Sequence, residues 1–363
     1  MELRQVITRS STGRKLSRTP DDRRLDLDSG RRTDQNLLVI LERDVGMFSL
    51  FIQVINTLRL IEEHNLEYVP VVLFGRGCIY FHDNGNMGKR SVWEYYFEPL
   101  VSGYSEEILL DALGSEPFDI IESIRRTKER ERGLVEFPQD IHLLPPLTDE
   151  DKRNYAQVQS TDRFSQCGWT ESFLPVIDGK RLSRSSDLAA ERLIAKQYIK
   201  FRPHVAHAIE NFYARHLDGY YVVGVHVRGT DGNSAPARGV EIPFRKYFTE
   251  IEREIETAGR ENCRVLVATD EQNFIDLFVE KFGDVVVFFD AVRKTDEDEI
   301  FGTGPTGQCV PAYITKSQDK AVRNGADVVI EYGLLCKAHT LIHNGSSISE
   351  AAKYSVERSA RVF

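Results

Sequence analysis

The run from Tyr220 to Asp231 constrains the fold of this chain most strongly, because it combines the composition of a buried strand with an abrupt polar end. Closely spaced valines follow the turn-forming Gly219 and predict a strand over residues 220–228. The polar residues that end the run are His226, Arg228, Thr230 and Asp231. In open α/β sheets, ligands bind beyond the carboxyl ends of the strands. The run therefore predicts an α/β sheet with a cation, Arg228, at its ligand-binding edge.

Arg228 has two interpretations. Its guanidinium is a planar fork that matches two phosphate oxygens, and the neighbouring Gly229 and Gly232 leave room for a ligand. His226 lies on the same strand face two residues earlier and can add a hydrogen bond. An arginine and an aspartate at a strand end also form ordinary solvated pairs that close loops. The choice between these two interpretations depends on the polar residues elsewhere in the chain.

The order of predicted elements indicates two doubly wound units. In the first, an apolar strand over residues 37–41 precedes an amphipathic helix from Phe48 to Ile61 and a strand over residues 68–74. In the second, strands alternate with helices between residues 220 and 355. The expected fold class is α/β, with two Rossmann-like domains. The expected boundaries are a disordered tail over residues 1–35, a domain over 36–205, a second domain over 206–355 and a tail over 356–363.

Predicted strands of the second unit end in polar residues. These ends are His226, Arg228 and Asp231; Thr269 and Asp270; and Asn344, Ser346 and Ser347. Because parallel strands share one carboxyl edge, we expect the three sets in one crevice. Residues 345–349 enter a helix whose first N–H groups favour an anion, although Ser346 or Ser347 could instead be a simple N-cap. Asp270 and Glu331 are candidate acceptors for a ribose or a purine edge, or else caps or surface residues.

The segment from Ser91 to Pro99 is dense in aromatic residues. Ser91, with Glu94 three residues later, forms the capping-box pattern and predicts a helix N-terminus. The buried face of that helix would contain Trp93, Tyr96 and Phe97. Such a face is either an ordinary core or a contact for a sugar.

Charge and motifs argue against several classes of protein. The formal net charge of -9 disfavours a nucleic-acid partner, so a phosphate site would need local positive charge. No Walker-type loop is present, and Gly302–Gly307 has the G-x-G-x-x-G form without the flanking strand and helix of the dinucleotide fingerprint. Asp296 and Asp298 are expected to be solvated rather than to hold a metal.

Cysteine usage and hydropathy suggest a compartment. The five cysteines are dispersed, without a C-x-x-C pair, which suits a reducing environment. The sequence has no secretory signal and no run of about 18 apolar residues, so we expect no transmembrane segment and a cytoplasmic location. The Golgi or endoplasmic-reticulum lumen is the alternative if an N-terminal anchor is missing. Nothing in the sequence indicates the oligomeric state.

Two Rossmann-like domains, with a phosphate site in the second and aromatic residues in the first, indicate a nucleotide-sugar transferase. Three motifs then carry a family resemblance. They are Gly224-Val-His-Val-Arg-Gly-Thr-Asp231, Val267-Ala-Thr-Asp-Glu271, and Asp327 to Ala338 followed by Asn344-Gly-Ser-Ser347. In this order they resemble motifs of the α-1,6-fucosyltransferases and the bacterial nodulation fucosyltransferase, and more loosely those of the protein O-fucosyltransferases.

The resemblance implies a GT-B fold, a GDP-fucose donor, a glycan-type acceptor, inversion at the anomeric carbon and no metal cofactor. It implies that Arg228 neutralises the leaving β-phosphate and that His226 contacts the nucleotide or phosphate. The other residues expected at the nucleotide are Thr230, Asp231, Asp270, Glu331, Ser346 and Ser347.

The sequence departs from the family pattern at the site. Gly229 replaces the second arginine of the α-1,6 enzymes, and Glu331 stands where the family often has aspartate. The candidate catalytic base is Glu241, with Glu94 and Asp44 as alternatives from the first domain.

Three alternatives to the fucosyltransferase reading stay open. The donor could be another nucleotide sugar, or the chain could bind a nucleotide sugar without catalysis. A plain Rossmann enzyme such as a dehydrogenase is the third, and the missing glycine fingerprint counts against it. The acceptor could be a glycan, a lipid-linked oligosaccharide or a protein.

Overall fold

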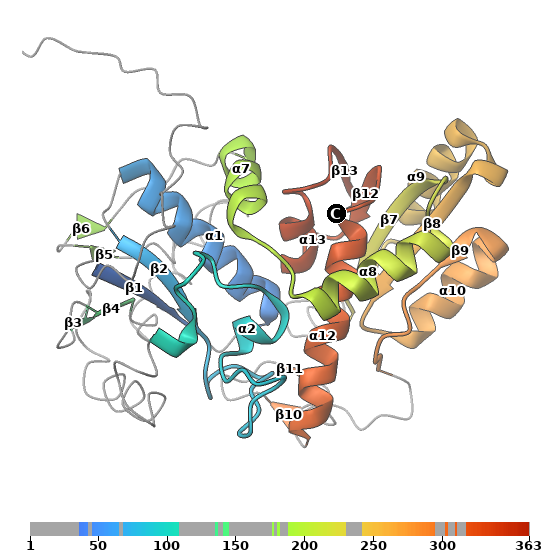
Figure 1. The fold of residues 1–363 in the computed structure, drawn as a ribbon. Coiled ribbons are helices and arrows are strands. Elements are labelled where there is room, and N and C mark those ends of the chain that lie inside the picture. The colour runs from blue at the N-terminus through green and yellow to red at the C-terminus, as the bar shows by residue number, and fades with distance from the viewer. Residues whose placement is uncertain are drawn as a thin grey trace, which may run out of the picture. The chain divides into compact units, whose positions relative to one another are not determined.

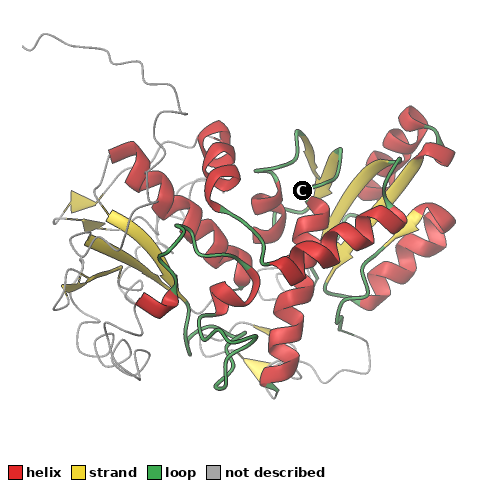
Figure 2. Cartoon of the chain, viewed as in Figure 1, coloured by secondary structure: helices red, strands yellow, loops and turns green. Residues whose placement is uncertain are grey.

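The structure is a computed structural model of α/β architecture, with one parallel sheet and one mostly parallel sheet that ends in an antiparallel pair (Figures 1 and 2). It describes residues 36–42, 46–64, 68–108, 135–136, 141–144, 176–177, 180–181, 188–229, 242–294, 302–303, 309–310 and 317–362. The expected tail over residues 1–35 lies outside these ranges, as do Asp296 and Asp298.

The first sheet has the strand order β2-β1-β4-β3. Its strands are β1 (Asn36–Leu41), β2 (Tyr68–Leu73), β3 (Val135–Glu136) and β4 (Ile141–Leu144). β1 pairs in parallel with β2 and with β4, and helix α1 (Met47–His64) connects β1 to β2. The apolar stripe of α1 is buried at Phe51, Val54 and Ile55. The predicted strand–helix–strand unit is confirmed.

The second sheet has the strand order β13-β12-β7-β8-β9. Its strands are β7 (Tyr221–Val227), β8 (Cys263–Thr269), β9 (Val286–Val287), β12 (Thr340–His343) and β13 (Arg358–Arg361). The neighbouring pairs are parallel, so their carboxyl ends share one edge. β13 falls within residues 356–363, which the sequence analysis assigned to a tail; pairing with β12 places this short polar segment in the sheet.

Helices α9 (Phe244–Ala258) and α10 (Gln272–Phe282) cover one face of the second sheet. Alternate residues of β7, Val223, Val225 and Val227, join this core, as expected for a strand with period-two packing. The opposite set on β7 includes Gly224, where an added Cβ would lie 2.9 Å from the Cβ of Ala338 and 3.2 Å from the Cδ2 of Leu335, the last residue of the neighbouring helix. Helix α12 (Gln318–Leu335) therefore packs close to the strand on that side.

The remaining elements complete the description. The helices are α2 (Val92–Tyr96), α7 (Leu188–Tyr198), α8 (Pro203–His216) and α13 (Ser347–Ala352), with 3₁₀ turns η3 (Arg260–Asn262) and η4 (Gly283–Val285). Two short antiparallel pairs are β5 (Val176–Ile177) with β6 (Lys180–Arg181) and β10 (Gly302–Thr303) with β11 (Cys309–Val310). The expected domain boundary at residue 205 falls inside α8.

Ser91 does not make the predicted capping box. It is the N-cap residue of α2, but its hydroxyl donates to the Val72 carbonyl and accepts the Phe74 N–H, so it extends the end of β2. Glu94 instead accepts the N–H of Glu106. The aromatic face of α2, at Trp93, Tyr96 and Phe97, is buried at 1% exposure or less, so it forms core and offers no surface to a sugar.

Aromatic contacts join α1 to α12. The rings of Phe48 and Phe51 lie 4.5 and 5.2 Å from that of Tyr332, between centroids. The hydroxyl of Tyr96 donates to the Val322 carbonyl at 2.7 Å. These contacts hold α1 and α2 against α12.

None of the helices described here is long and apolar enough to cross a bilayer. Cys78, Cys263 and Cys336 are free thiols.

Candidate functional site at the carboxyl edge of the second sheet

The carboxyl ends of β7 and β12 are tied together by one side chain. The amide oxygen of Asn344 accepts the Arg228 N–H at 3.3 Å, and its amide nitrogen donates to the Arg228 carbonyl at 3.2 Å. Asn344 thus extends the sheet by one residue beyond the strands. This reciprocal pair fixes the backbone from which the Arg228 side chain leaves the sheet.

Asp270, at the end of β8, holds Arg228 from the other side. Its carboxylate lies 3.2 Å from the Arg228 Nε and accepts the Gly229 N–H at 2.8 Å. The Arg228 side chain remains 37% exposed at this edge. Asp270 therefore orients Arg228 in this structure, whereas a contact to ribose or base was one of its expected roles.

His226 is buried under this edge as a neutral imidazole. Burial lowers the pKa of His226 to about 3, with the positive charge of Arg228 as a smaller cause in the same direction. Its Nδ1 shares a hydrogen bond of 3.0 Å with the Ser346 hydroxyl, and its carbonyl accepts the Tyr247 hydroxyl. A neutral ring in this place can orient Ser346 without adding charge.

Ser346 and Ser347 begin helix α13 and point to different partners. Ser346 is the N-cap residue, but its side chain makes no capping bond and instead contacts His226 and Ser349. The Ser347 Oγ lies 2.8 Å from the Ser49 Oγ in the first turn of α1. The simple capping interpretation of Ser346 is therefore wrong, because His226 competes for its hydroxyl.

Glu331 lies on α12 and forms a buried ion pair with Arg293. The Arg293 guanidinium lies 2.7 Å from its carboxylate, and both side chains are less than 10% exposed. Burial raises the pKa of Glu331, and Arg293 opposes that shift. Arg293 also donates to the carbonyls of Phe289 and Ala291, so the pair fastens the loop after β9 to α12.

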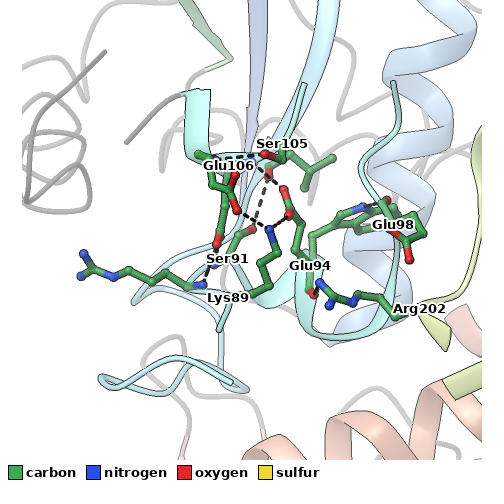
Figure 3. Close-up of polar contacts among 11 residues, drawn as sticks. Lys89, Ser91, Glu94, Glu98, Ser105, Glu106 and Arg202 are labelled. Atoms are coloured by element: carbon green, nitrogen blue, oxygen red, sulfur yellow. Dashed lines mark hydrogen bonds and ion pairs between the residues drawn. The ribbon is translucent and has the colours of Figure 1, made fainter. Parts of the chain in front are cut away.

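Several expected residues are placed elsewhere or not described. Thr230, Asp231, Glu241 and Asp44 lie outside the described residues. Glu94 is described, and its carboxylate is buried between the Glu106 N–H and Lys89 (Figure 3). In this arrangement Glu94 has no access to an acceptor hydroxyl, so the structure disfavours it as a base.

Three basic residues near the edge were missed by the sequence analysis. Lys294 lies beyond β9, 3.4 Å from Glu271, and Arg293 precedes it. Arg361 ends β13, beside His343 on β12. Polar residues gather at the carboxyl ends of strands in such sheets. This rule could have identified Lys294, which follows β9, and Arg361, if residues 358–361 had been predicted as a strand. Within the described residues, no group of three or more His, Cys, Asp or Glu side chains is arranged to hold a metal ion.

Comparisons with known proteins found similar solved structures. No protein-family model matches the chain, and no curated protein matches its sequence. A structure of the α-1,6-fucosyltransferase NodZ soaked with GDP-fucose is similar, with TM-score 0.50 and 16% identity over 90% of this chain and 95% of that one. NodZ from Bradyrhizobium also gives 0.50, at 16% identity over 90% and 94%. POFUT1 in complex with GDP gives 0.46, at 13% identity over 90% and 99%.

The likeness to NodZ confirms, at the level of the fold, the resemblance that the three motifs carry. Sequence identity is low, so donor and acceptor have to be argued from the residues of this chain.

Proposed function

We propose that this chain is an inverting, metal-independent glycosyltransferase with two Rossmann-like domains in a GT-B arrangement. It would transfer fucose from GDP-fucose to a glycan-type acceptor. The observation that carries the proposal is the partly exposed Arg228 side chain at the carboxyl edge of a parallel sheet, with Asp270 on its Nε and Asn344 on its backbone. Solved structures of similar fold include NodZ soaked with GDP-fucose, which supports the choice of donor.

In the proposed reaction, the bond between the anomeric carbon and the β-phosphate oxygen breaks, and GDP leaves with the electron pair. A bond forms between the anomeric carbon and the acceptor hydroxyl oxygen, whose proton passes to a base. The charge that develops on the diphosphate has to be stabilised as the bond breaks. A preorganised guanidinium supplies this stabilisation in a partly buried site, and Arg228 is held in place before the ligand arrives.

Neighbouring residues would share the donor. The Ser346 and Ser347 hydroxyls and the neutral imidazole of His226 offer hydrogen bonds to phosphate oxygens without adding negative charge. Thr230, Asp231 and Glu331 complete the proposed nucleotide site, to which Asp270 contributes by positioning Arg228. Glu241 is the proposed base, and a base is needed because the acceptor hydroxyl must lose its proton.

The test is a transfer assay with GDP-fucose, GDP-mannose, UDP-sugars and NAD as separate co-substrates. Glycan, lipid-linked and protein acceptors are each offered in EDTA, and both GDP release and product mass are measured. Fucosylated product from GDP-fucose in EDTA is the expected result. Product from a different nucleotide sugar would correct the donor. Binding of GDP-fucose without hydrolysis or transfer to any acceptor would contradict catalysis and favour a binding protein.

A further inference from the structure

Two histidines and one arginine form a row across the second sheet. In the register of β7, β12 and β13, His226 pairs with His343, and His343 pairs with Arg361. Register partners in a parallel sheet lie side by side on one face. The row therefore ends at the carboxyl edge of the outer strand with a guanidinium.

The loop that leads into α13 folds back over this row. The Ser346 hydroxyl contacts His226 at 3.0 Å, and the Gly345 N–H donates to His343 Nδ1 at 3.0 Å. At Gly345 itself, an added Cβ would lie 2.6 Å from the Cζ of Arg361. The Arg361 guanidinium is therefore packed directly against the loop, one residue before Ser346.

Gly345 allows this close approach for two reasons. Its φ is +81°, in the left-handed region that glycine adopts without strain. It also lacks the side chain that would displace the guanidinium. The contact between Arg361 and the loop thus depends on a residue that permits both the backbone turn and the packing.

Arg361 supplies the charge of the row. Burial lowers the pKa of both His226 and His343 to about 3, so the two imidazoles are neutral near pH 7. Arg361 is exposed, so it is accessible to a ligand on the loop.

The position next to Arg228 has no room for another cation. A Cβ at Gly229 would lie 2.6 Å from the Cγ of Glu271 and 2.7 Å from the ring of Phe274. A diphosphate carries more than one negative charge, and a single half-exposed guanidinium neutralises only part of it. Any second guanidinium has to reach the site from another strand.

We propose that Arg361 is a second anion-binding arginine of this site, contacting a diphosphate held over the loop Asn344–Ser347. Arg228 and Arg361 then approach the anion from opposite sides of this loop. The inference rests on the proposed function only in taking a nucleoside diphosphate as the ligand.

The experiment compares the affinities of GDP, guanosine and inorganic diphosphate by titration calorimetry. The variants are Arg361→Gln, Arg361→Lys and, as a matched control, Arg260→Gln. Arg260 is 52% exposed, pairs with the exposed Asp284 and precedes β8, at the amino edge of the sheet. Melting temperatures report whether each variant folds.

Arg361→Gln is expected to weaken GDP and inorganic diphosphate about tenfold, the loss of a charge-assisted hydrogen bond, and to leave guanosine unchanged. Arg361→Lys should keep part of that affinity, and Arg260→Gln all of it. If Arg361→Gln binds GDP within about twofold of the wild type, the proposal is wrong.

Equal weakening of GDP and guanosine would also overturn it, because it would indicate a structural role. If the wild type binds inorganic diphosphate through Arg361 but not GDP, the nucleotide assignment fails while Arg361 stands. If it binds neither, both proposals fail.

Discussion

The cluster around Lys89 and the carboxyl edge of the second sheet both gather charged side chains, and they differ in what surrounds the charge. Lys89 lies 3.2 Å from Glu94, as an ion pair rather than an aligned hydrogen bond, and 2.9 Å from Glu107. The Glu106 carboxylate accepts the N–H groups of Arg90 and Ser91 (Figure 3). The Lys89 side chain is 16% exposed, against 37% for Arg228.

The difference separates a structural cluster from a candidate ligand site. In the Lys89 cluster, the buried carboxylates bind protein N–H groups and one cation. These contacts are all within the protein, and they fix the turn before α2. At the sheet edge, Asp270 and Asn344 hold Arg228 in place, and its side chain stays 37% exposed. A search for buried carboxylates alone would have selected the Lys89 cluster. The exposure of an oriented cation instead selects the carboxyl edge of the second sheet as the candidate ligand site.

The largest effect expected is on turnover. Arg228→Ala should lower kcat for transfer by roughly 10²–10³, the loss seen when one preorganised donor to a developing charge is removed. The fold should persist, because partly exposed ion pairs contribute little to stability. Steady-state kinetics and a melting curve check this together. Full turnover by the variant would sink the assignment of the site.

The reverse pattern is expected in the other cluster. Glu94→Ala leaves the Glu106 N–H and the Lys89 ammonium without this carboxylate, and should lower the free energy of unfolding by about 3 kcal/mol. Affinity for GDP should stay the same in the fraction that is folded. Urea unfolding and GDP titration of one preparation measure both. A variant of normal stability with no GDP affinity would reverse the roles of the two clusters.

Acidification should destabilise the site through His226. Its folded pKa of about 3 lies below the ordinary value of about 6.5, so the unfolded chain binds the extra proton between these values. Stability is therefore lost as pH falls below about 6.5. At pH 5, about 1.5 pH units below the ordinary pKa, protonation of the unfolded chain lowers the free energy of unfolding by about 2 kcal/mol.

The check is urea unfolding at pH 7 and pH 5 for the wild type and His226→Gln. Glutamine can still bond Ser346 but does not titrate. The loss of stability between the two pH values should be smaller in this variant by about 2 kcal/mol. An identical loss in both proteins would show that His226 is not the group that titrates.

The smallest effect concerns orientation. Asp270→Asn keeps a side-chain oxygen for the Gly229 N–H but removes the charge beside Arg228, and should lower kcat about tenfold. The KM for GDP-fucose should change less, because Arg228 itself remains. A variant that raises KM alone would indicate that Asp270 contacts the nucleotide instead of positioning Arg228.

Local patterns predicted much of this fold. The alternation of apolar runs with amphipathic helices gave the parallel pairing of β1 with β2 and of β7 with β8. The polar strand ends predicted that Arg228, Asp270 and Asn344 would meet. These features depend on short-range periodicity and on one topological rule, so a single sequence contains them.

Other features depend on long-range partners that the sequence does not mark. Glu331 met Arg293 across 38 positions of chain, and Ser91 bound the end of β2 in place of its own helix. The sequence predicts Arg361 in a tail because β13 is short and polar, and only pairing with β12 makes this segment a strand. In each case a tertiary contact overrode a local pattern.

The central claim is that the carboxyl edge of the second sheet binds a nucleoside diphosphate through Arg228. Thermal unfolding of the wild type and Arg228→Ala with GDP, GDP-fucose, UDP and NAD, in EDTA, tests it most directly. A ligand that binds the folded state adds about 2.7 kcal/mol of stability at one hundred times its Kd. The account predicts selective stabilisation of the wild type by GDP and GDP-fucose that is largely lost in Arg228→Ala. No response to any nucleotide, or an equal response in the variant, would contradict it.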